Sequence, residues 1–418
     1  MRIKEVVRLS LISMLKNKMR TTLTVLGMVI GIASIVIVFS AGEGISSLIV
    51  GQIEAFGTNV IQTEIKVPNA KKGNQADSES AGAMASGVQI TTLNEKDLED
   101  IKRIPNISGG YGAILNQETV NYLNETKKAF LFGVGPDYIN IDKSELASGY
   151  FFSDSDNRSL SQVAVLSYKI AQDIFGDDDP IGKIITIKRS RFEVIGVLKE
   201  RGSMVGFDFD SMILLPVKTL QKKIMGIDYF MYTVHSVVDP DIAEDTAETM
   251  REILRENHDI SDPDRDDFRV TTMKEMLKMS KDITNSLTIL LLLIVIISLI
   301  VGGVGILNVM YVVVSERTPE IGLRKAVGAK FSDIMKQFLI ESVLITLIGA
   351  IIGIILGILA SFLICLGANY FGLEWKFSVP LKAFLVAILF ALFFGVIFGL
   401  FPARKAGRLD PVEALRKE

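Results

Sequence analysis

The chain has 418 residues, of which 49% are hydrophobic and 22% are charged, and its mean hydropathy is +0.37. This length exceeds one ordinary domain and this hydropathy is high for a soluble protein, so a membrane protein with a sizeable polar domain fits both figures. The single cysteine excludes an intrachain disulfide, and two histidines leave little room for a histidine-based metal site. Residues 43–282 hold 27 Lys and Arg against 39 Asp and Glu, whereas the remaining segments hold 18 against 9.

The chain opens with a basic segment that leads into the first apolar run. Residues 1–20 carry six basic residues and one acidic residue among apolar residues at helical spacing, which predicts a cytoplasmic amphipathic helix in the headgroup plane. A targeting segment is the alternative, because a signal peptide also begins in this way. Residues 21–42 predict transmembrane helix 1, since this run is longer than the core of a signal peptide. Its apolar stripe continues, so we expect one helix from Thr22 to Phe56.

Residues 43–282 predict an extracytoplasmic α+β domain with stalk helices. A strand–helix–strand order occurs both before and after a β-rich middle segment, which predicts a β-rich insert at about 137–225. Pro68–Gly87 reads as a mobile loop. The predicted strands are Asn59–Val67, Ile107–Ile114, Glu118–Leu123, Lys128–Gly133, Gln162–Leu166, Ile184–Ile187, Phe192–Leu198, Met212–Pro216, Met231–Val237 and Phe268–Thr272. The predicted helices follow an N-cap at Asn94 and span Tyr168–Phe175 and Asp241–His258.

The last third of the chain alternates between apolar runs and short polar segments, which completes a membrane protein with four transmembrane helices. One helix from Lys274 to Val314 is expected, because this stretch contains no proline. The predicted segments are transmembrane helix 2 at 283–314, a cytoplasmic loop at 315–333, transmembrane helix 3 at 334–366, a short outer loop at 367–380, transmembrane helix 4 at 381–401 and a cytoplasmic tail at 402–418. Glycines at small-xxx-small spacing predict close helix packing: Gly27, Gly31, Gly349, Gly353, Gly357, Gly395 and Gly399.

The basic residues of the short segments predict the topology. Lys and Arg gather on the cytoplasmic side of membrane proteins. The first 20 residues hold six of them, residues 315–336 hold five, the tail holds five and the loop at 367–380 holds one. Both termini and the 315–333 loop are therefore expected in the cytoplasm of a multi-pass inner-membrane protein, with the acidic domain outside.

The loop at 315–333 carries residues that are typical of the start and the end of a short helix. Thr318 suits an N-cap, Pro319 suits the first helical position and Gly328 suits the left-handed residue past the end. A plain positive-inside loop is the alternative interpretation. The helix is expected to touch something outside the membrane.

Catalytic and metal signatures are weak throughout. The stretch Gly176–Ile184 is one residue too long for a phosphate loop and lacks its Ser or Thr, and its three aspartates would repel phosphate. Asp177–Asp179 and Asp262–Asp267 lack the spacing of a calcium loop, so we read them as solvated faces. We therefore expect no enzyme activity, no metal and no bound cofactor.

Asn308 and Glu341 lie near the cytoplasmic ends of their runs; Asn308 is expected to hydrogen-bond between helices.

Several pieces of the chain together resemble the MacB/FtsX-type permeases of ABC transporters, and the resemblance covers essentially the whole chain. The residues that carry it are Asn17–Gly27, Ile30–Ala33, Asp179–Lys183, Phe192–Val197, Glu316–Ala329, Phe338–Ser342, Pro402–Ala406 and Asp410–Arg416. The segment Glu316–Ala329 is the most specific of them.

The resemblance implies that Thr318–Gly328 is a coupling helix that docks on a separate ABC ATP-binding subunit, which holds ATP and Mg²⁺. The implied contact residues are Glu316, Arg317, Glu320, Ile321, Gly322, Arg324, Lys325, Ala326, Val327 and Gly328. Of these, Ile321, Ala326 and Val327 are expected to be buried on the partner, with Glu320, Arg324 and Lys325 setting orientation. It also implies a second permease copy, as a homodimer or heterodimer, and often a periplasmic adaptor; no nucleic acid is expected.

Two function classes remain open at this stage. The first is an export permease, in which ATP hydrolysis moves the outer domain mechanically and drives a substrate from the outer side of the membrane. The second is a signalling permease that activates an extracytoplasmic partner, such as a cell-wall hydrolase, and transports nothing. The tail is short, so the ATPase is expected on another chain. Nothing in the sequence selects a substrate.

Overall fold

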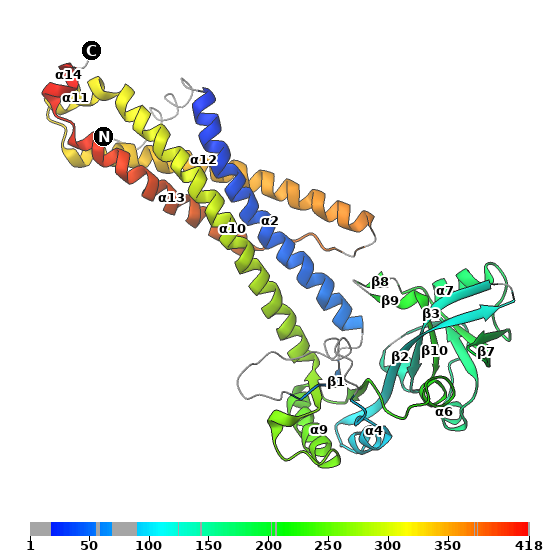
Figure 1. Ribbon diagram of the computed structural model, residues 1–418. Helices are drawn as coiled ribbons and strands as arrows, with labels where there is room; N and C mark the ends of the chain where they lie inside the picture. The colour runs from blue at the N-terminus through cyan, green and yellow to red at the C-terminus, as the bar shows by residue number, and fades with distance from the viewer. Residues whose placement is uncertain are drawn as a thin grey trace. The chain divides into compact units, whose positions relative to one another are not determined.

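The computed structural model of the protein describes residues 18–55, 59–68, 90–123, 125–142, 144–201, 203–204, 207–371, 373 and 375–416 (Figure 1). The chain divides into two compact units. The helical unit comprises Met1–Ile49 and Ser280–Glu418, and the soluble unit comprises Val50–Met279. Most of the predicted N-terminal amphipathic helix and of the Pro68–Gly87 loop lies outside the described residues.

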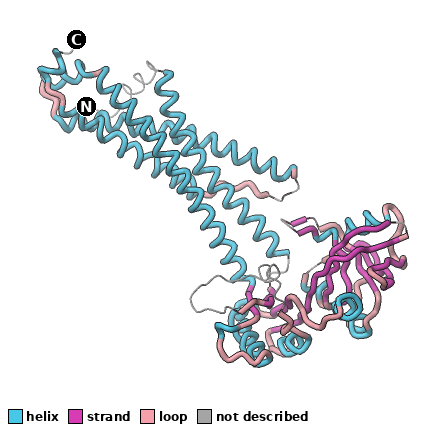
Figure 2. Tube along the Cα trace, viewed as in Figure 1, coloured by secondary structure: helices cyan, strands magenta, loops and turns pink. Residues whose placement is uncertain are grey.

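Four long helices make up most of the helical unit (Figure 2). Within the described residues, four helices are long and apolar enough to cross a membrane. They are α2 (Lys18–Ala55), α10 (Met273–Glu316), α12 (Phe331–Tyr370) and α13 (Leu381–Arg408). The predictions of continuous helices over Thr22–Phe56 and Lys274–Val314 are confirmed within these residues, since α2 and α10 each continue from one unit into the other.

Glycines allow these helices to approach one another closely. A Cβ built on Gly27 would lie 3.0 Å from the Cα atom of Gly302, so α2 and α10 touch through their backbones. A Cβ on Gly353 of α12 would lie 2.8 Å from the carbonyl oxygen of Val29 in α2. The other predicted packing glycines also lie against a neighbouring helix: Gly31, Gly349, Gly357, Gly395 and Gly399. Asn308, which was expected to reach a neighbouring helix, is instead exposed.

The soluble unit is built on one mixed sheet. Among the described residues, ten strands form it, in the order β12-β1-β11-β2-β3-β10-β5-β7-β4, with β6 pairing with β2 and β7. The strands are β1 (Val60–Ile65), β2 (Ile107–Tyr122), β3 (Glu125–Val134), β4 (Leu146–Gly149), β5 (Val163–Leu166), β6 (Ile184–Ile187), β7 (Ser190–Leu198), β10 (Met212–Pro216), β11 (Tyr232–Val237) and β12 (Phe268–Thr272). A separate two-stranded sheet pairs β8 (Ser203–Met204) with β9 (Phe207–Asp208).

Strand β2 corrects one prediction. The sequence predicted two strands, Ile107–Ile114 and Glu118–Leu123, but β2 runs unbroken for 16 residues. It pairs with β3 in continuous antiparallel register from Ala113 opposite Val134 to Tyr122 opposite Glu125. Asn116 and Gln117 stay in the ladder, opposite Leu131 and Phe130 of β3. The two predicted clusters of strands therefore share one sheet, joined through β2 and β3.

Short helices cover this sheet. The helices are α4 (Glu95–Lys102), α5 (Tyr138–Ile141), α6 (Asp154–Ser159), α7 (Tyr168–Phe175), α8 (Val217–Thr219) and α9 (Ala243–Asn257), with a π-helical segment at Leu220–Met225 and 3₁₀ turns at Phe209–Ser211, Pro240–Ile242 and Pro263–Arg265. Asn94 caps α4 as predicted, since its side chain accepts the amide of Lys96 at 2.8 Å. Apolar residues of α4 and α9 are buried in one cluster with the sheet, including Leu98, Ile101 and Met250.

The two histidines of the soluble unit have opposite environments. His235 in β11 is fully buried, and neither ring nitrogen makes a hydrogen bond of normal geometry to a described residue. Burial, with a smaller effect of Lys102, lowers the pKa of His235 to about 3. His258, after α9, lies between two carboxylates: Nδ1 is 2.7 Å from Asp267 and Nε2 is 3.3 Å from Asp97. Burial alone would lower its pKa, but the two carboxylates outweigh that effect and raise it to about 9.

We expect His258 to make folding stability fall at alkaline pH. Its folded-state pKa of about 9 exceeds the ordinary value of 6.5, so its contribution is fully present below pH 6.5 and is lost as the pH rises through about 9. The contribution is about 3 kcal/mol. Thermal unfolding of the detergent-solubilised chain between pH 6 and 10 measures it. In His258→Gln the melting temperature should fall less steeply between pH 6.5 and 9, whereas His235→Leu should show the same fall as the wild type. If the fall is unchanged in His258→Gln, His258 is not its cause.

Candidate docking surface

Helix α11 (Thr318–Ala326) occupies the charged segment between α10 and α12. Its start differs from the prediction by one residue. The N-cap position is Arg317, because only this residue separates α11 from α10, and the Thr318 hydroxyl donates back to the carbonyl of Val314 at 3.1 Å. Gly328 lies just past the end with φ +99°, as predicted, and its amide donates to the carbonyl of Lys325 at 3.1 Å.

One side of α11 is buried inside the chain. Ile321 is 1% exposed and belongs to the core cluster of the four long helices. Gly322 is buried as well, and a Cβ built on it would lie 2.8 Å from Ala414 of α14 (Pro411–Arg416). Figure 1 shows α11 and α14 beside each other. Ile321 and Gly322 were expected to contact a partner; in this structure the chain's own helices cover both.

The basic residues of this segment hold α11 in place. Arg317 pairs with the buried Glu341 of α12 at 3.3 Å, and Arg324 donates to Gln337 of the same helix at 2.7 Å. Lys325 donates to the carbonyls of Gly407 and Leu409, at 2.9 and 2.6 Å, where α13 ends. Carbonyls at a helix end lack intrahelical partners, so a lysine there is favourable. Arg324 and Lys325 were expected to orient a partner, but they are engaged within the chain.

The opposite side of α11 is apolar and acidic. Leu323 is 61% exposed and Val327 is 82% exposed. Pro319, Glu320 and Ala326 are exposed with them, at spacings that place all five on one side of the helix. We call these five residues the α11 outer face. The sequence did not single out Leu323, because α11 contains two large apolar residues, Ile321 and Leu323, and its nine residues do not reveal which of them the neighbouring helices cover.

Two family models match this chain. Residues 21–250 match a MacB-like periplasmic core domain, and residues 292–411 match the C-terminal part of FtsX-like permeases. The first match covers more than half of the chain, and the second includes α11 and most of the last three long helices.

Curated relatives match nearly the whole chain. The macrolide export ATP-binding/permease protein MacB 2 of Aeromonas hydrophila is 34% identical, over 100% of this chain and 61% of its own length. The pyoverdine export ATP-binding/permease protein PvdT of Pseudomonas savastanoi pv. phaseolicola is 35% identical, over 96% of this chain and 58% of its own length. The chain thus spans about three-fifths of the curated relatives it matches. Among solved structures, the periplasmic region of MacB from Actinobacillus actinomycetemcomitans aligns over 55% of this chain and 96% of its own, with a TM-score of 0.45 and 20% identity.

Proposed function

The chain belongs to the MacB-type family of ABC export permeases, and from this membership we propose that it couples ATP hydrolysis on a partner chain to movement of its soluble unit. The observation that carries the proposal is the α11 outer face. Leu323 and Val327 offer a small apolar contact beside Glu320, while buried Ile321 and the engaged Arg324 hold the helix in place behind it. A rigid helix with an exposed apolar face is suited to docking in a groove of another protein.

The chain offers a direct covalent route from α11 to the soluble unit. Helix α10 begins at the residue after β12 ends, and only Arg317 separates α10 from α11. With 44 residues, α10 is about 66 Å long at 1.5 Å per residue. Between residues 268 and 318, all of which the structure describes, only Arg317 lies outside strand and helix, so we propose that a displacement of α11 acts on the edge strand β12. We propose that α10 transmits the ATPase cycle in this way.

The proposed orientation places α11, α14 and both termini on the cytoplasmic side of the inner membrane. The uneven distribution of Lys and Arg supports it, since the short segments on one side of the four apolar helices carry most of the basic charge. The soluble unit then lies outside the cytoplasm and works on a substrate that has already left the membrane. A second permease copy and an adaptor outside the membrane belong to the same proposal.

Isolation of the tagged chain from native membranes tests the proposed partner. In a mild detergent, we expect it to bring down a protein with a phosphate-binding G-x-x-x-x-G-K-[ST] loop, identified by mass spectrometry, together with vanadate-sensitive ATP hydrolysis. This chain contributes no such loop in its 418 residues. An unrelated four-span membrane protein with the same tag is the control. Isolation of the intact chain without any ATP-binding protein, after crosslinking in the membrane, contradicts the proposal.

A further inference from the structure

The sheet of the soluble unit passes into α10 without a loop. Strand β12 ends at Thr272 and α10 begins at Met273, so the backbone changes from extended to helical between adjacent residues. Strand β12 lies at one edge of the sheet and pairs with β1. A tilt of α10 against the sheet therefore either bends the chain at this point or carries the edge strand with it.

A reciprocal pair of hydrogen bonds fixes the first turn of α10. The Thr272 amide donates to the carboxylate of Glu275 at 3.0 Å, and the Glu275 amide donates to the Thr272 hydroxyl at 3.1 Å. This arrangement is a capping box, which satisfies amides that the start of a helix leaves without intrahelical partners. Thr272 is 1% exposed, so water has little access to these bonds. Bending the chain between Thr272 and Glu275 breaks both of them.

Helix α9 holds the same turn from a second direction. The Thr272 hydroxyl donates to the carboxylate of Glu244, in the first turn of α9, at 3.2 Å. About two turns further along α9, the guanidinium of Arg251 lies 3.6 Å from the other carboxylate oxygen of Glu275. Glu275 thus joins the first turn of α10 both to β12 and to α9.

Arg251 also reaches the edge strand itself. The guanidinium nitrogen that faces Glu275 donates to the carbonyl oxygen of Val270 in β12 at 3.1 Å, and the other terminal nitrogen pairs with Glu248 at 2.7 Å. A guanidinium carries its N–H donors in a rigid planar fork, so one side chain holds several acceptors in a fixed geometry. Arg251 therefore ties α9, β12 and α10 together through one group.

Helix α9 is in turn anchored to the sheet (Figure 1). Ala247, Met250 and Leu254 are fully buried on α9 and belong to the same core cluster as Ile61 of β1 and Val270 of β12. A movement in which α9 follows α10 away from the sheet would expose these side chains to water, which is unfavourable. The contacts of α9 with α10 are therefore contacts with the sheet as well.

We propose that Arg251, Glu275 and Thr272 make α9, β12 and the first turn of α10 one rigid joint, so that α10 moves the edge of the sheet instead of bending where it leaves β12. Arg251 is a positioning residue of this joint, since it acts on α10 through Glu275. The use of the joint rests on the proposed coupling, whereas its rigidity is a property of this chain alone and is tested without an ATP-binding subunit.

Double electron–electron resonance between spin labels on α9 and α10 measures this rigidity. The labels are attached through Glu256→Cys and Asp282→Cys, two exposed positions on either side of the joint, in a Cys365→Ser background that removes the single native cysteine. The full chain is held in lipid nanodiscs without nucleotide. We expect one narrow distance distribution. A broad or bimodal distribution in this chain overturns the proposal.

Two substitutions of Glu275 weaken the joint to different degrees. Glu275→Ala removes the side-chain half of the capping box together with the ion pair, and the width of the distribution should at least double. Glu275→Gln keeps an oxygen for the Thr272 amide, because Gln also serves in capping boxes, and loses only the charge that faces Arg251. Its width should lie between the other two. Wild-type widths in both variants overturn the proposal.

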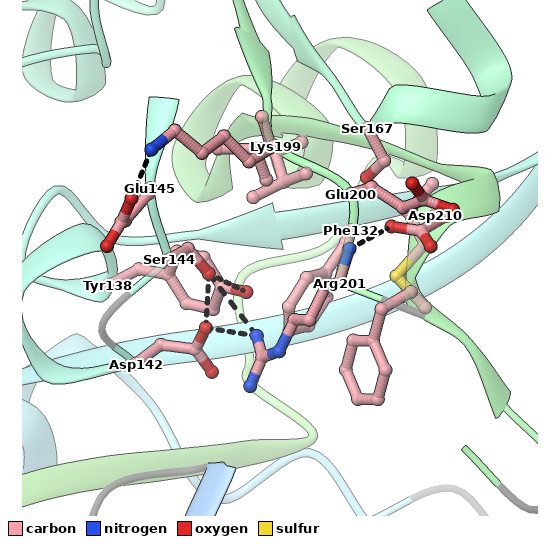
Figure 3. A pocket seen from close by; sticks show the side chains of 14 residues that line it. Phe132, Tyr138, Asp142, Ser144, Glu145, Ser167, Lys199, Glu200, Arg201 and Asp210 are labelled. Carbon is pink, nitrogen blue, oxygen red and sulfur yellow. Dashed lines mark hydrogen bonds and ion pairs between the residues drawn. The ribbon is translucent and has the colours of Figure 1, made fainter. Parts of the chain in front are cut away.

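Arg251→Gln and Arg201→Gln form a matched pair that separates rigidity from stability. The two arginine side chains are 22% and 23% exposed, and each pairs with carboxylates inside the soluble unit. Figure 3 shows Arg201 beside Asp142, and neither of these residues belongs to α9, β12 or α10. Both substitutions should lower the melting temperature, but only Arg251→Gln should widen the distribution. Equal widths in the two variants overturn the role of Arg251, and this comparison also decides if Glu275→Ala fails to fold.

A second pair of labels separates the joint from the proposed coupling. Glu256→Cys with Tyr370→Cys, at the exposed end of α12, reports on the soluble unit and the helical unit together. With the co-isolated ATP-binding protein, ATP and vanadate should shift this distance and leave the distance between positions 256 and 282 unchanged. If neither distance shifts, the proposed coupling is contradicted while the rigid joint is supported. If both distances shift, α10 bends at the joint and the proposal is overturned.

Discussion

Replacing Leu323 with aspartate is expected to reduce association with the proposed ATP-binding subunit at least tenfold. Leu323 is 61% exposed on the α11 outer face, so its replacement leaves the packing of the chain intact. Full burial of a leucine at an interface contributes about 1.5–3 kcal/mol, and an aspartate there adds an unpaired charge that must lose its water. Val327→Asp should act in the same direction, because Val327 is 82% exposed beside it.

Co-isolation of the ATP-binding subunit and stimulated ATP hydrolysis in nanodiscs measure this loss. Tyr370→Asp is the matched control, because Tyr370 is 88% exposed at the end of α12 that lies away from α11. This substitution is expected to leave both readouts unchanged. Ile321→Asp is unsuitable as a test, since Ile321 is 1% exposed and a charge there disrupts the helical unit itself. Wild-type association in both Leu323→Asp and Val327→Asp would show that the α11 outer face is not the docking surface.

Replacing Gly353 with leucine is expected to separate α12 from α2 and to destabilise the helical unit by about 1–3 kcal/mol, the usual range for overpacking. A Cβ at this position lies 2.8 Å from the carbonyl oxygen of Val29 and 2.9 Å from the Cβ of Ile32. Both atoms belong to a packed helix and cannot rotate away, so the helices must move apart. Few other forces hold apolar helices together in a lipid environment, where close packing drives association.

Gly367→Leu on the same helix is the matched control. A Cβ on Gly367 meets no atom within 4 Å, so the gain in helix propensity is the same but the clash is absent. Thermostability of the two variants in detergent, followed by size-exclusion chromatography after heating, compares them directly. Equal melting temperatures for Gly353→Leu and Gly367→Leu would contradict the contact between α2 and α12.

The sequence predicted the elements well where the residue pattern depends on local chemistry. Tyr168–Phe175, Ile184–Ile187 and Phe268–Thr272 have the predicted bounds, because alternation or helical spacing and turn residues mark both ends. The four apolar helices followed from length alone. The family was predicted from motifs, and the family models confirm it.

The sequence could not reveal which side of a short helix is covered. In α11, Ile321 and Leu323 are equally apolar and only two positions apart, and the distinction comes from α14, which begins 85 residues after α11 ends. The ion pair of Asp142 with Arg201 was missed for a similar reason. These residues are 59 positions apart and meet because β4, which begins four residues after Asp142, pairs with the end of β7, with Leu146 opposite Leu198. Such proximity depends on strand order, which a single sequence does not determine.

The unbroken ladder through β2 and β3 has a consequence for exchanging parts between relatives. Strand β10 pairs with β3 in parallel register over Met212–Pro216, and β6 pairs with the far end of β2. A graft that cuts near residues 137 and 225 therefore breaks the pairing of β10 with residues 130–134 of β3 and the pairing of β6 with Val120 and Asn121 of β2. The donor lobe must supply a strand of the same register, or the recipient is left with an open edge that invites aggregation. An exchanged block that includes the β2–β3 hairpin keeps the β3–β10 and β2–β6 pairs together, and its success then depends on the pairing of β2 with β11 over residues 107–113.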